Sequence, residues 1–327
     1  MNDTESVWMA GLGWLERERE GFALPPGQEP ELFRLKGLGE LAAIAEVLWR
    51  RPDLPASVRA RVHALLEFAW RELGEGEVLA RFLEARAYPV LGTTYSVFER
   101  VGWRHEPTRQ RLAALGQPGA LAAARPSAPK GAGEPVAAQY GSDGVAVLCL
   151  GLALSWEVLR LPSPWQRPRL YLNTRLAKRP EVAELSVPEG YSLTHAVFFM
   201  TDWGADPHGL PATERAYLAE HGPRWMEAFR RQRHFDLYAE LAAVLCCVEA
   251  PAPAEAESVL RAAQEEDGAV PGPAERIAER TRGIEDAERR RFISAYHTTL
   301  AATLASFALT VGLGRTGAAA VSAPGPA

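Results

Sequence analysis

The chain has 327 residues, 47% of them hydrophobic, and a formal net charge of −5 at pH 7. This composition suits a large buried core, and the acidic balance gives no electrostatic basis for binding nucleic acid or an anionic membrane. The three cysteines, Cys149, Cys246 and Cys247, lie in apolar runs and form no CxxC pair, so we expect buried thiols in a reducing compartment.

The beginning of the chain lacks a basic stretch followed by an uninterrupted apolar core, so we expect no signal peptide. The longest apolar runs, residues 145–156 and 300–313, contain Gly, Ser or Thr and are shorter than a membrane span. We therefore expect a cytoplasmic protein that has neither nucleic acid nor a membrane as a partner.

Helical periodicity dominates the chain after an N-terminal extension, which we place at residues 1–30 because it ends in a Pro-Pro-Gly break. Apolar residues at three- and four-residue spacing predict most of the helices that follow, and polar segments supply the rest. The predicted helical segments are residues 31–51, 58–73, 78–86, 93–104, a helix that opens at 106–108, 145–161, 171–184 (one helix or a pair), 191–204, 212–220, 223–230, 234–248, 255–264, 274–282 and 292–309. Two segments are predicted to be irregular: a mobile surface loop at residues 116–135, rich in Ala, Pro and Gly, and a disordered tail at residues 314–327.

The order of these segments predicts an all-α fold. No sustained alternating hydrophobic run is present, and the GLGRTG sequence at residues 312–317 follows a helix, which is the wrong context for a dinucleotide site. Apolar helices that carry His or Tyr start near residues 40, 93, 143, 192, 235 and 295, with more charged helices between them. This period of about fifty residues predicts a single-domain α/α toroid of about five to six helix pairs over residues 31–313.

A short turn at residues 264–272, QEEDGAVPG, resembles the Q-x-x-D-G turn that recurs in α/α-toroid enzymes such as terpenoid cyclases. In that family the Gln and Asp tie the loop to neighbouring helix ends, so the resemblance implies a stabilising role for Gln264 and Asp267. Through its TH-x-x-FF-x-TD-x-G segment at residues 194–204, the whole chain also resembles an actinobacterial family of unassigned function. That second resemblance implies no mechanism.

Three known activities of toroid enzymes are disfavoured by missing motifs. The chain has neither the DxDD acid motif of protonating terpene cyclases nor the DDxxD pair that holds magnesium and diphosphate. Its three thiols do not supply the separated Cys, Cys and His zinc ligands of lanthionine cyclases.

The first candidate site is a pair of polar residues in the apolar segment 191–204. His195 and Asp202 are seven residues apart, so a continuous helix places them on nearly the same face. We expect both to face the interior of the toroid, with His195 as a general acid or base and Asp202 as its orienting carboxylate. The alternative is that His195 hydrogen-bonds a neighbouring helix and Asp202 caps the next segment.

Further candidates begin the following inner helices. His234 and Tyr238 are one turn apart, and His297 is predicted to open the last inner helix. If the inner helices run parallel, His195, His234 and His297 lie in first turns and converge at one mouth of the toroid. The predicted catalytic residues are therefore these three histidines with Asp202 and Tyr238. No cofactor is expected, and Zn²⁺ or Fe²⁺ held by the histidines and Asp202 remains an alternative whose ligands the sequence does not fix.

These residues predict an enzyme of bacterial specialised metabolism, such as a cyclase in natural product biosynthesis. It would catalyse a non-redox acid/base reaction (cyclisation, elimination or hydrolysis) on a small apolar substrate. The alternative is a non-catalytic helical protein that binds a peptide or protein partner in the same concavity. The enzyme requires a closed, apolar-walled pocket with polar side chains in hydrogen-bond reach, whereas the binding protein requires a shallow, open lumen. The sequence does not define the oligomeric state.

Overall fold

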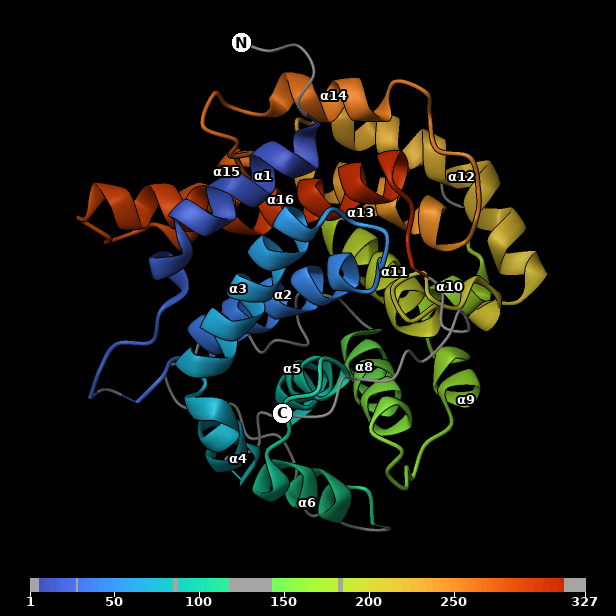
Figure 1. The fold of residues 1–327 in the computed structure, drawn as a ribbon. Coiled ribbons are helices and arrows are strands. Elements are labelled where there is room, and N and C mark those ends of the chain that lie inside the picture. The colour runs from blue at the N-terminus through green and yellow to red at the C-terminus, as the bar shows by residue number, and fades with distance from the viewer. Residues whose placement is uncertain (1–5, 28, 85–87, 118–142, 182–184, 315–327) are drawn as a thin grey trace.

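The computed structural model describes residues 6–27, 29–84, 88–117, 143–181 and 185–314 (Figure 1). These residues form α-helices and short 3₁₀ turns, and they contain no β-strand, which confirms the all-α prediction.

Six apolar helices form an inner layer in which each helix contacts the next along the chain. They are α2 (Leu32–Trp49), α5 (Tyr88–Arg100), α8 (Gly144–Val158), α11 (Val187–Met200), α13 (Phe235–Cys247) and α16 (Ala287–Thr310). The last of them, α16, also contacts α2, so the inner helices close into a ring (Figure 1). This cyclic order of contacts is the one we expect of an α/α toroid.

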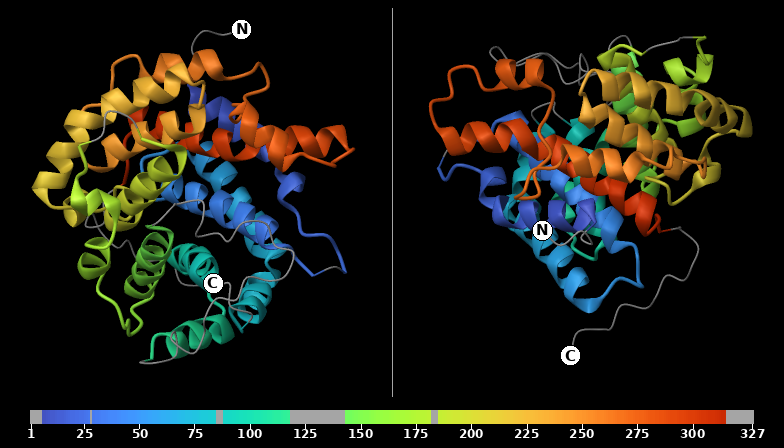
Figure 2. Two further views of the ribbon diagram at one scale, coloured as in Figure 1. Left: turned by 180° about the vertical axis from the view of Figure 1, so that it is seen from behind. Right: turned by 90° about the horizontal axis from the view of Figure 1, so that it is seen from above.

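Shorter or more polar helices lie outside the ring. They are α1 (Val7–Arg17), α3 (Ala56–Glu72), α4 (Glu77–Glu84), α6 (Glu106–Leu115), α9 (Arg167–Tyr171), α10 (Arg175–Lys178), α12 (Ala212–Arg231), α14 (Ala256–Ala263) and α15 (Ala274–Arg280). The 3₁₀ turns are Arg19–Phe22, Gly74–Gly76 and Pro207–Gly209. Among these, α3 packs on α2, α12 on α13, and α1 and α15 on α16. Figure 2 shows α12 on the outside of α13 from behind.

The core lies between the inner ring and the outer helices. Its largest fully buried side chains include Trp14 on α1, Trp156 on α8, Trp225 on α12 and Phe198 on α11. Burial of large aromatic side chains dominates the hydrophobic stabilisation of a core, at roughly 1.5–3 kcal/mol for a side chain of Phe size. The packing of both layers therefore fixes the inner helices around their common centre.

The segment expected to be an N-terminal extension includes α1, which is part of this core. The Trp8 backbone N–H donates to the Ser306 hydroxyl at 3.0 Å, and the Trp14 ring stacks on Phe292 with centroids 6.1 Å apart. Residues 7–17 are therefore packed directly against α16.

The Q-x-x-D-G turn joins α1 to α16. Gln264 Nε2 donates to the carbonyls of Val7 at 3.1 Å and of Gly268 at 2.9 Å, and Asp267 pairs with Arg291 on α16 at 2.5 Å. Gly268 adopts φ 93°, in the left-handed region that favours glycine. These contacts tie the turn to α1 and to α16.

Three inner helices, α5, α11 and α16, start four or five residues earlier than predicted. The Ser186 backbone N–H donates to Glu189 at 2.9 Å in a capping box that starts α11, and Asp286 caps α16. As a result, His195 and His297 lie more than about two turns inside their helices. The prediction that they occupy first turns is wrong, because the polar capping segments lie outside the apolar runs that indicate these helices in the sequence.

The predicted mobile loop and tail lie outside the described residues, apart from residues 116, 117 and 314. Within the described part of the chain, α16 is the one helix with the length and apolar composition of a membrane span, and 83% of its most apolar window is buried inside the protein. A helix in the core of a folded protein can have this length and composition without crossing a membrane.

Candidate functional site

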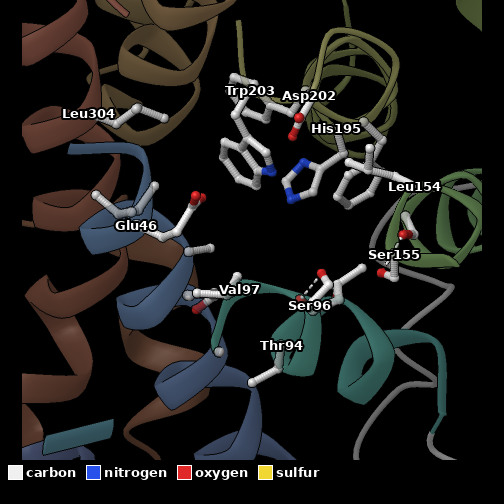
Figure 3. A pocket seen from close by; sticks show the side chains of 18 of the residues that line it. Glu46, Thr94, Ser96, Val97, Leu154, Ser155, His195, Asp202, Trp203 and Leu304 are labelled. Carbon is white, nitrogen blue, oxygen red and sulfur yellow. Dashed lines mark hydrogen bonds between the residues drawn. The ribbon is translucent and has the colours of Figure 1, made fainter. Parts of the chain in front are cut away.

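The inner ring surrounds a cavity with a volume of about 140 Å³ (Figure 3). All six inner helices line it, and much of the wall is apolar: Ile44, Val97, Leu148, Leu154, Phe198, Phe199, Trp203, Leu300 and Leu304.

The charged and titratable lining residues form two groups. We call the first the acid–base cluster (Lys36, Glu40, His195, Glu240 and His297, with Asp236 behind them) and the second the arginine cluster (Glu46, Arg50, Arg100 and Asp202). Glu40 and Glu46 are six positions apart on α2, which corresponds to about 9 Å along the helix axis.

His195 lies on α11 and lines the cavity as predicted. Its Nδ1 lies 3.1 Å from the Tyr191 carbonyl, which can only accept, so Nδ1 carries a hydrogen and Nε2 carries the lone pair in the neutral ring. Burial, together with the nearby charges of Lys36 and His297, lowers the pKa of His195 to about 3. The imidazole is therefore neutral at pH 7.

The group nearest to this imidazole on the facing helix is the buried carboxyl of Glu240 on α13. Its Oε2 lies 3.6 Å from His195 Nδ1 and accepts a hydrogen bond from the Thr194 hydroxyl. Burial and the neighbouring carboxylate of Asp236 raise the pKa of Glu240 to about 8. At neutral pH a protonated carboxyl therefore lies beside a neutral imidazole.

His297 on α16 joins two further carboxylates. Its Nδ1 lies 2.8 Å from Asp236 Oδ1, and its Nε2 lies 3.4 Å from Glu40 Oε1. Burial opposes the charged form, but the two carboxylates outweigh it and raise the pKa of His297 to about 10. Burial alone would raise the pKa of Asp236 and of Glu40, but nearby positive charges lower both pKa values. His297 lowers the pKa of Asp236. Lys36, whose Nζ lies 3.2 Å from Glu40 Oε1, and His297 lower the pKa of Glu40. These four groups form a chain of ion pairs.

This chain of contacts continues toward the outside of the ring. The Tyr191 hydroxyl donates to Asp236 Oδ2, and Arg276 on α15 donates to the Tyr191 hydroxyl. Asp236 is therefore held on both of its oxygens, which fixes the orientation of the whole acid–base cluster.

Among the residues that the structure describes, Asp236, Glu240 and His297 could hold a metal, since each offers one ligand atom and these atoms lie within 4.8 Å of one another. This set shares His297 with the predicted ligands and does not include His195, His234 or Asp202. The Nδ1 atom of His297 already donates to Asp236, so a metal bound at this atom would displace that hydrogen bond.

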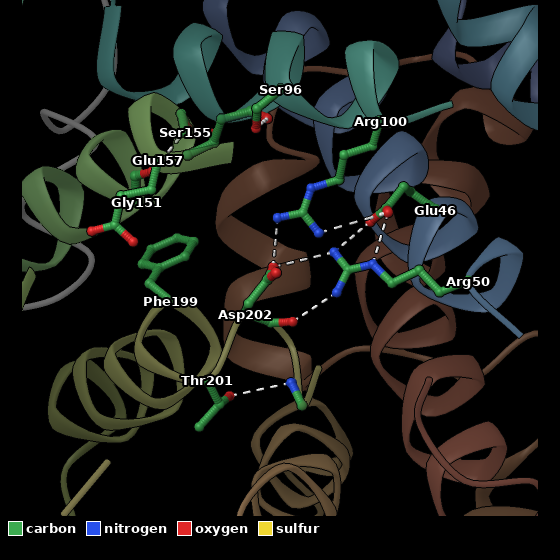
Figure 4. A network of polar contacts seen from close by, with 12 residues as sticks. Glu46, Arg50, Ser96, Arg100, Gly151, Ser155, Glu157, Phe199, Thr201 and Asp202 are labelled. Carbon is green, nitrogen blue, oxygen red and sulfur yellow. Dashed lines mark hydrogen bonds and ion pairs between the residues drawn. The ribbon is translucent and has the colours of Figure 1, made fainter. Parts of the chain in front are cut away.

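The arginine cluster holds Asp202 (Figure 4). Arg50 donates to both oxygens of Glu46 at 2.7 and 2.6 Å and to the Asp202 carbonyl at 2.7 Å. Arg100 donates to Asp202 Oδ1 at 2.8 Å. The expected pairing of Asp202 with His195 is therefore wrong. The helix ends at Met200, so the seven-residue spacing no longer places the two side chains on one face.

The turn after α11 has an unusual backbone. Asp202, Trp203 and Gly204 have φ values of 49°, 57° and 84°, and the first two lack the freedom of glycine. Such residues cost of order 1–3 kcal/mol each and persist where surrounding contacts enforce them. Here the arginine cluster holds Asp202, and the Trp203 ring stacks on Phe198 with centroids 4.5 Å apart. The turn brings both side chains to the cavity wall.

Two predicted site residues do not line the cavity. His234 is the N-cap of α13, and its Nδ1 accepts the Leu237 backbone N–H at 3.3 Å, which uses the side chain for capping. Tyr238 is fully buried. Burial, and to a lesser extent the charge of Glu255, raises its pKa to about 12, although the positive charge of Arg230 on α12 partly offsets this increase. The predicted convergence of His234 and Tyr238 with the other candidates is therefore wrong.

The sequence identifies Asp236 and Glu240 as a second pair of residues one turn apart, without deciding whether this face or the one with His234 and Tyr238 meets the cavity, and it indicates no site role for Glu40. The sequence pattern places Glu40 in an amphipathic helix, and Asp236 and Glu240 at the polar start of a later one. The available signal is that all three lie in apolar stretches, where an ionisable group needs a partner. Their partners, His195 and His297, are predicted correctly as residues that face the cavity.

A protein-family model described as "Domain of unknown function (DUF6895)" matches residues 9–307. No curated protein and no solved structure matches the chain. The matched residues include both clusters and every inner helix except the last turn of α16. The chain therefore belongs to the family described as Domain of unknown function (DUF6895).

Proposed function

We propose that the protein is an enzyme that transfers protons to and from a small organic molecule held in the central cavity. The observation that carries this proposal is the protonated carboxyl of Glu240 beside the neutral imidazole of His195, 3.6 Å apart at the cavity. Titratable groups whose environments shift their pKa values apart are typical of acid/base sites.

The two residues are suited to different tasks. A pKa of about 8 makes Glu240 an effective proton donor near neutral pH. A pKa of about 3 makes His195 a weak base, so its Nε2 lone pair is better suited to accept a hydrogen bond from the substrate. We therefore assign the proton transfer to Glu240 and the orientation of the substrate to His195.

The cavity supports a non-redox reaction such as a cyclisation, elimination or hydrolysis on a molecule with an apolar body. Apolar side chains such as Ile44, Phe199 and Leu300 contact the ligand space and exclude water, which strengthens the polar interactions within it. A role in bacterial specialised metabolism and a cytoplasmic location are further parts of this proposal, carried by the sequence alone.

The shape of the cavity favours the enzyme over the peptide-binding alternative. A space of about 140 Å³ inside a closed ring of helices is below the usual size of a drug-binding pocket and suits a small molecule. A peptide would need an open groove along the ring.

Exchange with solvent deuterium tests the proposal even while the substrate is unidentified. Purified protein is incubated in D₂O with metabolite mixtures, and mass spectrometry identifies compounds that gain deuterium or are converted. We expect Glu240→Gln to lower the rate about 100-fold or more, as for general acids elsewhere. The control is Glu227→Gln, which changes an exposed carboxylate paired with Arg230 and Arg231 and should leave the rate unchanged. Compounds that bind but are never altered would identify a binding protein instead.

A further inference from the structure

The arginine cluster constrains the chemistry of the ligand, because its carboxylates are already engaged. Glu46 receives two hydrogen bonds from Arg50, and Asp202 Oδ1 receives hydrogen bonds from Arg50 at 3.3 Å and from Arg100 at 2.8 Å. Two guanidinium groups and two carboxylates give the cluster a net charge of zero.

Two donors at this end of the cavity have no acceptor among the residues that the structure describes. Arg100 uses NH2 for Asp202, while its NH1 lies 3.8 Å from Glu46, beyond hydrogen-bond distance, and its Nε donates to no described residue. The Trp203 indole N–H likewise donates to none of the described residues, although the ring lines the cavity beside His195 (Figure 3). Guanidinium and indole nitrogens can only donate hydrogen bonds. The unused hydrogen-bonding capacity of Arg100 and Trp203 is therefore all of the donor kind.

Both side chains have limited access to water, since the Arg100 side chain is only 17% exposed and the Trp203 ring is stacked on Phe198, but the protein does not bury their donor atoms completely. A donor that has lost water gains most from a charged acceptor, and a guanidinium matches the two oxygens of a carboxylate. Because the cluster is otherwise neutral, a singly charged carboxylate fits it better than a doubly charged phosphate. The rest of the wall requires an apolar body.

We propose that the ligand of the cavity is a small carboxylic acid whose carboxylate accepts hydrogen bonds from Arg100 and Trp203. Its apolar body lies along the wall formed by residues such as Val97 and Leu304. This inference deepens the proposed function and rests on it only in taking the cavity as the place where the ligand binds.

Calorimetric titration with matched probes tests the inference. The probes are linear monocarboxylates from acetate to octanoate and the primary amides of the same chain lengths. We expect at least one acid to bind the wild-type protein about tenfold or more tightly than its amide. Arg100→Gln and Trp203→Phe should each weaken binding of the acid about tenfold and barely affect the amide. Arg51→Gln should keep the preference, because Arg51 pairs with Asp53 away from the cavity.

Two features keep the test decisive. Trp203→Phe retains an aromatic ring to stack on Phe198 and leaves the arginine pairs intact, so it remains informative if Arg100→Gln fails to fold. The inference is overturned if no acid in the series binds, if acids and amides bind equally, or if Trp203→Phe and folded Arg100→Gln keep the wild-type preference. Carboxylate binding without any deuterium exchange or conversion would refute only the proposal that the protein is an enzyme. Glu240-dependent turnover of a neutral compound would refute only the proposal that the ligand is a carboxylic acid.

Discussion

The Nδ1 atom of His195 lies 3.6 Å from Oε2 of Glu240, so α11 and α13 each supply one half of the acid–base pair. The backbone carbonyl of Tyr191 and the hydroxyl of Thr194, both on α11, hold these two groups in place. The contact between the two inner helices therefore sets the geometry of the pair.

Replacing the Glu240 carboxyl should separate stability from activity. The pKa of Glu240 rises from 4.5 to about 8 on folding, so the folded state binds more protons than the unfolded state between these values, and this group lowers stability as pH rises through that window. Glu240→Gln stays neutral at every pH. We expect its thermal midpoint at pH 8 to equal or exceed that of the wild type, and the difference in favour of the variant to be smaller at pH 4. A variant that is less stable at pH 8 but not at pH 4 would show that the buried carboxyl is ionised and paired.

The pH dependence of the reaction should report the same carboxyl. If protonated Glu240 is the donor, the rate is constant below about pH 8 and falls about tenfold per pH unit above it. The residual rate of Glu240→Gln should show no limb at that pH. Rates of deuterium exchange measured between pH 6 and pH 10 check this, and an alkaline limb that persists in Glu240→Gln would assign it to another group.

His297 should make stability depend on pH in the alkaline range. Its pKa rises from 6.5 to about 10 on folding, so its contribution is fully present below pH 6.5 and is lost as pH rises through 10. We expect the difference in unfolding free energy between the wild type and His297→Gln to shrink between pH 6 and pH 10 in urea titrations. A His297 imidazole signal, assigned by its absence from the spectrum of His297→Gln, that titrates near 6.5 in the folded protein would contradict this prediction.

Asp202 should matter for stability through its arginines. Asp202→Asn leaves the Arg50 and Arg100 side chains without the charged partner at 3.3 and 2.8 Å, and we expect a loss of about 1–3 kcal/mol in unfolding free energy. The matched control is Asp53→Asn at the exposed ion pair with Arg51, which should change the unfolding free energy far less than Asp202→Asn, because water screens this pair. Equal losses in both variants would refute the role of the arginine cluster.

The inner helices can be predicted from the sequence because their apolar character extends over thirteen residues or more, as in α8 and α16. Their cyclic contacts agree with the regular period of about fifty residues. Helix starts are less predictable, since the cap residues Ser186 and Asp286 are polar and carry no periodic signal.

The site can be predicted in part, and the failures share one cause. His195 and His297 are identified because an imidazole in an apolar helix requires a partner. The predicted pairing of Asp202 is wrong because the spacing rule assumes a helix that continues, whereas α11 ends at Met200. Glu240 lies one turn from Asp236 in the sequence, but only the packing of α13 against α11 decides which face of that helix meets His195.

The closure of the ring by α16 on α2 determines when the site can exist. Glu40 and His297 are in contact although they are more than 250 residues apart in the sequence. Contacts at such separation form late, because the intervening chain must first be ordered. Until α16 docks, the carboxyls of Glu40, Asp236 and Glu240 lack the imidazolium that lies among them in the finished protein. In the proposed enzyme, the acid–base cluster is therefore complete only once the last inner helix has been made and has docked on α2.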